Sequence, residues 1–124
     1  MQPWIMIQRG MVTGWEDKMN IREELGKRML FFDGGLGSLL QARGLKPGEL
    51  PETWNLSKPE ELLAIHKEYL EAGADIILAN TFGANRFKYD HLQEIVEAAV
   101  KNAKKAAEEC GRNAYVALDL GPTG

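Results

Sequence analysis

The chain has 124 residues, a hydrophobic content of 44% and a formal net charge of -3 at pH 7. These values describe one soluble globular domain, or part of one, with no electrostatic attraction to nucleic acid or anionic membranes, and no stretch approaches the roughly 18 apolar residues of a membrane span. Cys110 is the single cysteine, which excludes an internal disulfide and favours a cytoplasmic location.

The first 19 residues show no clear hydrophobic period, and we expect them to form a loosely ordered tail. Organised structure is predicted to begin at Asn20, which has capping-box spacing with Glu23. Ile21 and Leu25 supply the apolar side of a short helix. Residues 20–124 are therefore predicted to form the organised part of the chain, one domain or part of one.

A short apolar run at residues 29–32 is followed by Asp33 and two glycines, which predicts a first strand buried on both faces. A helix is predicted over residues 37–42, with Gly44 ending it. The stretch 45–56 contains Pro and Gly and is predicted to be a loop. A loop of this length can carry function.

A third helix is predicted to run from Pro59 to Gly73, because Ser57 and Glu60 have capping-box spacing and apolar residues follow at helical intervals. Residues 76–79 form another apolar run, which predicts a second strand. Polar residues follow this strand at once, as they follow the first.

The stretch from about residue 90 to 110 has apolar residues at steps of three and four, and it predicts a long helix capped by Gly111. Residues 114–118 are predicted to form a third strand, and residues 119–124 its exit loop. Strands alternating with long amphipathic helices predict an α/β fold with a parallel sheet and right-handed crossovers.

Parallel strands all point the same way, so their exit loops should emerge on one rim, where α/β folds bind ligands. We expect three polar segments to meet on that rim: Asp33 to Gly35, Asn80 to Gly83 and Asp119 to Gly124. Carboxylates can receive an ammonium group, and glycine amides can approach a carboxylate closely, so the rim suits an amino acid. The same residue types also serve as plain turn residues, and the pattern alone leaves both interpretations open.

Residues 21–124 resemble the homocysteine S-methyltransferase family. The motifs that carry the resemblance are Phe32-Asp33-Gly34-Gly35-Leu36-Gly37, the stretch from Pro59 through Gly73 to Asp75, Asn80-Thr81-Phe82-Gly83-Ala84 and Asp119-Leu120-Gly121-Pro122-Thr123-Gly124. The sequences of the last two motifs resemble the cobalamin-dependent methionine synthases more closely than the betaine-dependent relatives.

The resemblance implies a (β/α)8 barrel of which this chain carries the first three units. It also implies zinc, held by cysteines of later strands, and cobalamin as methyl carrier in the full-length enzyme; neither is expected to bind this chain. By position, Asp33, Gly34 and Gly35 would hold the amino acid end of homocysteine, and Thr81 would assist, with Asn80 and Asp119 as weaker candidates. Cys110 matches none of the zinc ligands, so the chain is assigned no metal ligand and no catalytic residue.

Two classes of function remain open. The chain is part of a methyltransferase that binds homocysteine and needs the remaining barrel strands for turnover, or it is a non-catalytic truncated α/β module that associates with another copy. Within the first class, betaine-dependent and S-methylmethionine-dependent enzymes remain alternatives. Nucleic-acid and membrane partners are not expected.

Other reactive residues are expected to be structural. His66 lies on the apolar side of its helix and should be packed or hydrogen-bonded, and His91 should be solvated. Gly34, Gly35 and Gly37 lack the lysine of a phosphate-binding loop and the glycine spacing of a dinucleotide site.

Overall fold

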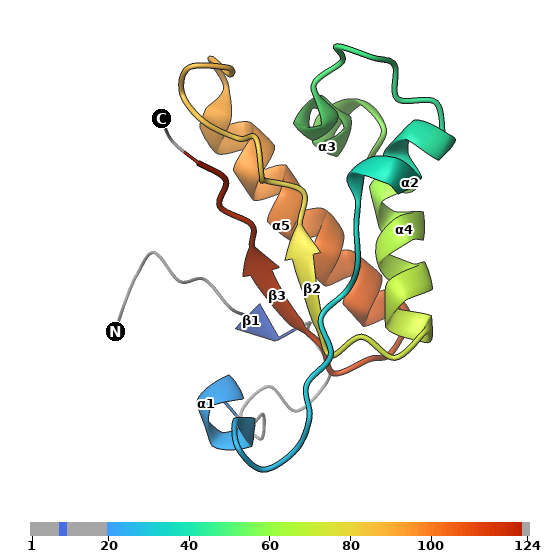
Figure 1. The fold of residues 1–124 in the computed structure, drawn as a ribbon, viewed down its shortest axis with the longest axis vertical. Helices are drawn as coiled ribbons and strands as arrows, with labels where there is room; N and C mark the ends of the chain where they lie inside the picture. Colours follow the sequence, from blue (N-terminus) through green and yellow to red (C-terminus); the bar gives the residue numbers. More distant parts are fainter. Residues whose placement is uncertain (1–7, 10–19, 123–124) are drawn as a thin grey trace.

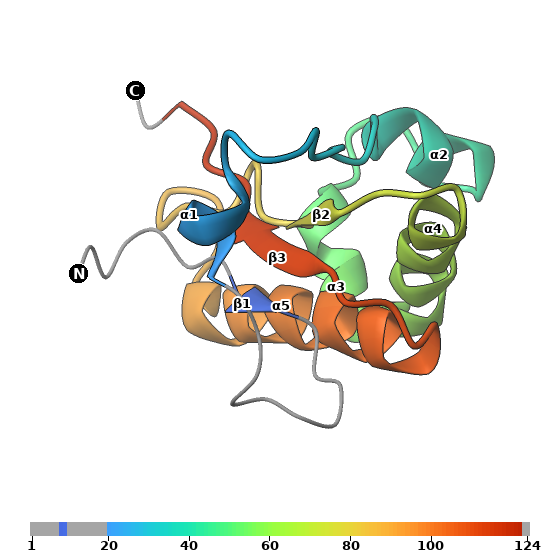
Figure 2. The ribbon, with the colours of Figure 1, turned by 90° about the horizontal axis from the view of Figure 1, so that it is seen from below.

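The computed structural model describes residues 8–9 and 20–122. They form an α/β unit with a three-stranded sheet, in the order β1-β3-β2, and two long helices, α4 (Pro59–Glu71) and α5 (Leu92–Glu109), that pack on the same face of the sheet (Figures 1 and 2). The strands are β1 (Gln8–Arg9), β2 (Ile76–Ala79) and β3 (Tyr115–Leu118).

Strands β2 and β3 pair in parallel over their full length, from Ile76 opposite Tyr115 to Ala79 opposite Leu118. This confirms the second and third predicted strands and the parallel arrangement between them. The crossover between them contains α5, as a parallel pair requires. Both strands therefore end at the same edge of the sheet.

The described residues contain six helical segments: α1 (Ile21–Glu24), α2 (Gly37–Ala42), a 3-10 turn η2 (Pro51–Thr53), α3 (Trp54–Ser57), α4 (Pro59–Glu71) and α5 (Leu92–Glu109). All but η2 and α3 lie close to predicted positions. The capping box of α1 is present, with Asn20 and Glu23 bonding reciprocally. Gly44, Gly73 and Gly111 follow α2, α4 and α5 with positive φ angles of 107°, 110° and 63°, the left-handed conformation in which glycine ends a helix.

Two predictions around residue 57 are wrong. The stretch predicted as a loop contains η2 and α3, and the predicted cap of α4 by Ser57 is not formed. Ser57 is the last residue of α3, where its hydroxyl donates to the carbonyl of Thr53, four residues earlier, and Lys58 takes the N-cap position of α4 without a side-chain bond. Proline at the first position of α4 fixes the start of that helix instead.

The first predicted strand is reduced to a single parallel bridge between Phe32 and Ile76. Its main chain follows β2, because Ile76 donates to Phe31 and Asp33 donates to Ile76. The next bond of a parallel ladder would join the Leu78 amide to the Asp33 carbonyl, but the Asp33 carboxylate accepts that amide instead at 3.1 Å. The ladder ends there, and the expected burial is also wrong, since Phe31 is 56% exposed and Phe32 59%.

Strand β1 was not predicted. Gln8 lies opposite Val116 and Arg9 opposite Tyr115, so this short strand runs antiparallel along the outer edge of β3. The sheet of the described residues is thus mixed. The other residues of the predicted tail, except the two of β1, lie outside the described residues, and their looseness stays a prediction.

The core lies between the sheet and the two long helices. It is built from Ile77, Ala79 and Val116 of the sheet, Leu70 of α4, and the alanines at positions 99, 103, 106 and 107 of α5. Small side chains on α5 let the helix axis approach the sheet closely, so a larger residue there would force strain of about 1–3 kcal/mol.

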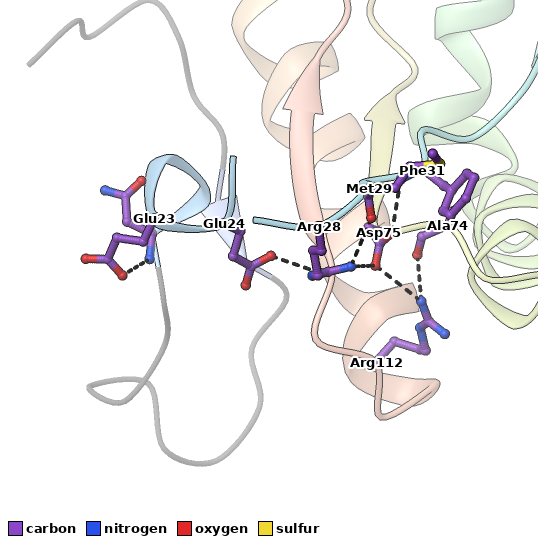
Figure 3. Close-up of polar contacts among 9 residues, drawn as sticks. Glu23, Glu24, Arg28, Met29, Phe31, Ala74, Asp75 and Arg112 are labelled. Atoms are coloured by element: carbon purple, nitrogen blue, oxygen red, sulfur yellow. Dashed lines mark hydrogen bonds and ion pairs between the residues drawn. The ribbon is translucent and has the colours of Figure 1, made fainter. Parts of the chain in front are cut away.

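The lower end of the sheet, where the strands begin, is held by a network of charged side chains (Figure 3). Arg28 donates to the carboxylates of Asp75 at 3.1 Å and Glu24 at 2.9 Å. Asp75 also accepts the amide of Phe31 at 3.0 Å, and Arg112 donates to the carbonyl of Ala74 at 3.0 Å. The network joins α1, the first extended segment and the loops before β2 and β3.

His66 is packed in the interior, as one of the two alternatives predicted. It is 1% exposed, and within the described part of the chain neither ring nitrogen has a hydrogen-bond partner. Burial lowers the pKa of this imidazole from 6.5 to about 4, so the ring is neutral at pH 7. No helix among the described residues is long and apolar enough to cross a membrane.

Candidate functional site

The opposite, upper end of the sheet holds a cavity of about 560 Å³. All six residues predicted for the site line it: Asp33, Gly34, Gly35, Asn80, Thr81 and Asp119. They come from the exit of the first extended segment and the exits of β2 and β3, so the parallel direction of these segments brings them together as expected. Their side chains, however, do different things.

The two carboxylate oxygens of Asp33 differ in their hydrogen bonding. Oδ2 accepts the Leu78 amide, whereas Oδ1 is buried and has no hydrogen-bond partner among the described residues. Burial raises the pKa of this carboxyl from 3.8 to about 6, and the negative charge of Asp119 adds to the rise. A buried acceptor without a donor costs folding free energy.

Gly34 and Gly35 continue the cavity lining directly after Asp33. The hydroxyl of Tyr69 donates to the Gly35 carbonyl at 2.6 Å, and a Cβ at position 34 would lie 3.0 Å from that hydroxyl oxygen. Tyr69 therefore fixes this turn through the Gly35 carbonyl. Within the described residues the amides of both glycines donate to no acceptor, which leaves them available.

Thr81 lines the cavity, but its hydroxyl joins two of the exit loops. Its hydroxyl donates to the Asp119 carbonyl at 2.8 Å and accepts the Asp119 amide at 3.0 Å. Both hydrogen-bonding functions of the hydroxyl are thus used by the backbone of the next loop. Asp119 keeps its carboxylate at the cavity, where burial and then the charge of Glu52 raise its pKa.

Asn80 is also structural in its side chain. The side chain is buried, and its amide group donates to the carbonyl of Pro51 and to the side-chain oxygen of Asn55, each at 3.0 Å. These bonds tie the end of β2 to the stretch that contains η2 and α3. The side-chain amide is thus engaged with that stretch rather than with the cavity.

Glu52 is a cavity residue that the sequence did not reveal. It lies in η2, is 4% exposed, and accepts the amide of Gly83 at 2.5 Å and the hydroxyl of Tyr89 at 2.6 Å. The available signal was a carboxylate inside a long segment between two predicted helices, a segment whose length alone suggested a function. Nothing in the sequence pairs it with residues 31 and 37 positions later.

The cavity is acidic. Asp33, Glu52 and Asp119 line it, and none of its described lining residues is Lys, Arg or His. Such a cavity favours a cationic group of a ligand, such as an ammonium. Among the described residues no three His, Cys, Asp or Glu side chains are grouped so that they could hold a metal ion. Cys110 caps the C-terminal end of α5 and does not line the cavity.

Comparisons with known proteins agree with this arrangement. Residues 30–124 match the family described as homocysteine S-methyltransferase. A methionine synthase of Mycobacterium tuberculosis (strain ATCC 25618 / H37Rv) is 30% identical over 118 aligned residues, covering 83% of this chain and 10% of that protein.

Solved structures show the same fold. The metallated form of the homocysteine methyltransferase MmuM from Escherichia coli matches with a TM-score of 0.71 at 24% identity, covering 84% of this chain and 42% of that one. Its oxidised form matches with a TM-score of 0.69 at 22% identity, covering 84% and 41%. The chain thus spans about a tenth of the synthase and about two fifths of the solved enzyme.

Proposed function

Because the chain belongs to the homocysteine S-methyltransferase family, we propose that its cavity binds the amino acid end of homocysteine in an enzyme that forms methionine. The single observation that carries this proposal is the buried Oδ1 atom of Asp33, which lacks a donor at the rim of an acidic cavity. An ammonium group supplies such a donor together with the opposite charge.

The described residues can bind both ends of an α-amino acid group. Asp33 and Asp119 present carboxylates to the cavity, and the amides of Gly34 and Gly35 are available to a ligand carboxylate. Backbone amides in a glycine turn can approach an anion closely because no side chain intervenes. Homocysteine would be held by its amino and carboxyl groups, with its thiol directed away from these residues.

The rest of the proposal rests on the family. The fold is consistent with the first three units of a (β/α)8 barrel, and the full-length enzyme would use zinc to bind the thiol and methylcobalamin as donor. The described residues do not fit a zinc site, so this chain's share in the reaction is binding and orientation of the substrate. We propose that activation of the thiol and the methyl transfer depend on other parts of the enzyme.

Exposed apolar side chains support the dependence on further strands. Met29, Phe31 and Phe32 are 73%, 56% and 59% exposed along the first extended segment. Side chains of this size each contribute about 1.5–3 kcal/mol when they are buried. We therefore propose that the chain binds homocysteine well only when barrel strands from the rest of the enzyme cover these groups.

Calorimetric titration of L-homocysteine tests this function. We expect no measurable heat with the chain alone, and binding when the chain is mixed with zinc and a polypeptide that carries the rest of the barrel from a relative. Asp33→Ala should abolish that binding, whereas Asp90→Ala, which removes an exposed carboxylate, should not. Tight binding by the chain alone, or normal binding by Asp33→Ala, would contradict the proposal.

A further inference from the structure

We propose that Glu52 is a positioning residue of this pocket, which fixes the loop after β2 through the amide of Gly83. The inference deepens the proposed function and rests on it for the identity of the ligand. It assigns a role to a side chain outside the motifs of the three strand exits, and it explains why residue 83 is glycine.

The contacts of Glu52 divide between its two oxygens. Oε1 accepts the Gly83 amide at 2.5 Å, and Oε2 accepts the Tyr89 hydroxyl at 2.6 Å. Glu52 and Tyr89 are only 4% and 7% exposed, so water does not compete strongly for these bonds. A single carboxylate therefore holds the loop at two points six residues apart.

The segment that carries Glu52 is itself fixed to the rest of the fold. The buried side chain of Asn55 donates to the carbonyls of Asn80 at 2.9 Å and Ile95 at 3.2 Å, and Asn102 donates to the Asn55 carbonyl at 3.1 Å. These bonds join α3 to the end of β2 and to α5. Glu52 therefore projects from an anchored element, and the loop after β2 is the part that it positions.

Glycine at position 83 is a requirement of this contact. A Cβ there would lie 2.7 Å from Glu52 Oε1, closer than real Cβ contacts allow, so any side chain would displace the carboxylate. The preceding residue, Phe82, lines the cavity and accepts the Gly121 amide at 3.1 Å. The position of Gly83 therefore sets the position of Phe82 and, through Gly121, of the loop after β3.

The carboxylate also acts electrically on the cavity. Its negative charge adds to the effect of burial in raising the pKa of Asp119. Substitution by glutamine separates the two roles, because an amide oxygen can still accept the Gly83 amide and the NH2 group can donate to Tyr89, while the charge is lost. Substitution by alanine removes both roles.

Hydrogen exchange at the Gly83 amide tests the inference in the full chain without any ligand. We expect Glu52→Ala to speed exchange at Gly83 about tenfold or more, since it removes a hydrogen bond to a charged acceptor. Glu52→Gln keeps a neutral acceptor for the Gly83 amide and should speed exchange by only about threefold, and Tyr89→Phe should also give an increase smaller than that of Glu52→Ala. Glu60→Ala, at an exposed glutamate of α4, is the matched control and should have no effect.

Titration of L-homocysteine into the assembled barrel completes the test. Glu52→Ala and Gly83→Ala should both weaken binding about tenfold or more, while Glu52→Gln keeps most of the affinity because it keeps the loop in place. Unchanged exchange at Gly83 in Glu52→Ala would overturn the inference, and so would a loss of affinity in Glu52→Gln equal to that in Glu52→Ala. If no form binds homocysteine, the proposed function fails, and exchange at Gly83 alone decides the role of Glu52.

Discussion

The two ends of the sheet treat acidic side chains in opposite ways. At the lower end the carboxylates of Glu24 and Asp75 face guanidinium groups, with Arg28 at 2.9 Å and 3.1 Å and Arg112 at 3.9 Å from Asp75 (Figure 3). At the upper end the carboxylates that line the cavity have no Lys, Arg or His ion-pair partner within the described residues.

The difference separates stability from binding. Paired charges at the lower end hold loops together and need no ligand to balance them. In parallel α/β barrels this end generally serves stability. Uncompensated charges at the upper end cost folding free energy that a bound cation can recover. Removal of a carboxylate charge should therefore have opposite effects on stability at the two ends.

The largest expected effect on stability comes from a steric clash at the upper end. In Gly121→Ala the new Cβ would overlap the carbonyl oxygen of Phe82, and we expect the free energy of unfolding to fall by about 3 kcal/mol. Gly37→Ala is the control, because a Cβ at that first residue of α2 meets no atom within 4 Å. Urea unfolding followed by circular dichroism measures both, and equal stability of the two variants would contradict the tight approach of these loops.

Asp75→Ala should break the lower end. It removes the acceptor of Arg28 and of the Phe31 amide, and we expect a loss of about 2 kcal/mol, moderated because Arg28 is half exposed. The difference in stability between parent and variant should become smaller at 1 M salt, because salt screens the exposed ion pair of the parent. A variant as stable as the parent would show that this network does not hold the loops.

Asp33→Asn should have the opposite sign and raise the free energy of unfolding at pH 7 by about 1 kcal/mol. Because burial raises the pKa of Asp33 from 3.8 to about 6, the folded state binds this proton more tightly than the unfolded state. The stabilisation is complete below the unfolded pKa and is lost as the pH rises through the folded one, so the advantage of Asn should vanish below about pH 4. Unfolding at both pH values checks this, and a less stable variant at pH 7 would refute it.

Asp119→Asn should have the smallest effect on stability, again in the direction expected for the upper end. Burial raises the pKa of this carboxyl too, but the side chain is more open to solvent, so we expect a gain of only a few tenths of a kcal/mol at pH 7. The double variant with Asp33→Asn should gain slightly less than the sum, because each carboxylate raises the energy of the other. Thermal unfolding at matched pH measures the difference, and a loss of stability would count against an uncompensated charge.

Elements fixed by local pattern were predictable from the sequence. The period of α5, the apolar runs of β2 and β3 and the glycines that end the helices all depend on residues close together in the chain. Strand β1 was not predictable, because two residues carry no period and their pairing depends on β3, more than a hundred residues later. The prediction of a full strand in the first extended segment failed for a related reason. The side chain of Asp33, not its main-chain carbonyl, accepts the next amide of β2.

The site divides in the same way. The three strand exits could be placed on one rim, because parallel strands share a direction and each exit carries polar residues. The partners of individual atoms could not be placed: Thr81 and Asn80 use their side chains to join loops, and Glu52 reaches the cavity from η2. Such contacts depend on the three-dimensional path of the chain.

The carboxylate of Asp33 serves both as the last acceptor of the sheet and as a group facing the cavity. A cationic ligand that keeps Asp33 ionised also strengthens the bond from the Leu78 amide, since an ionised acceptor binds an N–H more strongly than a neutral one. Ligand affinity and the attachment of the first extended segment to β2 are then thermodynamically linked, and by reciprocity whatever fastens that segment tightens the binding of the ligand.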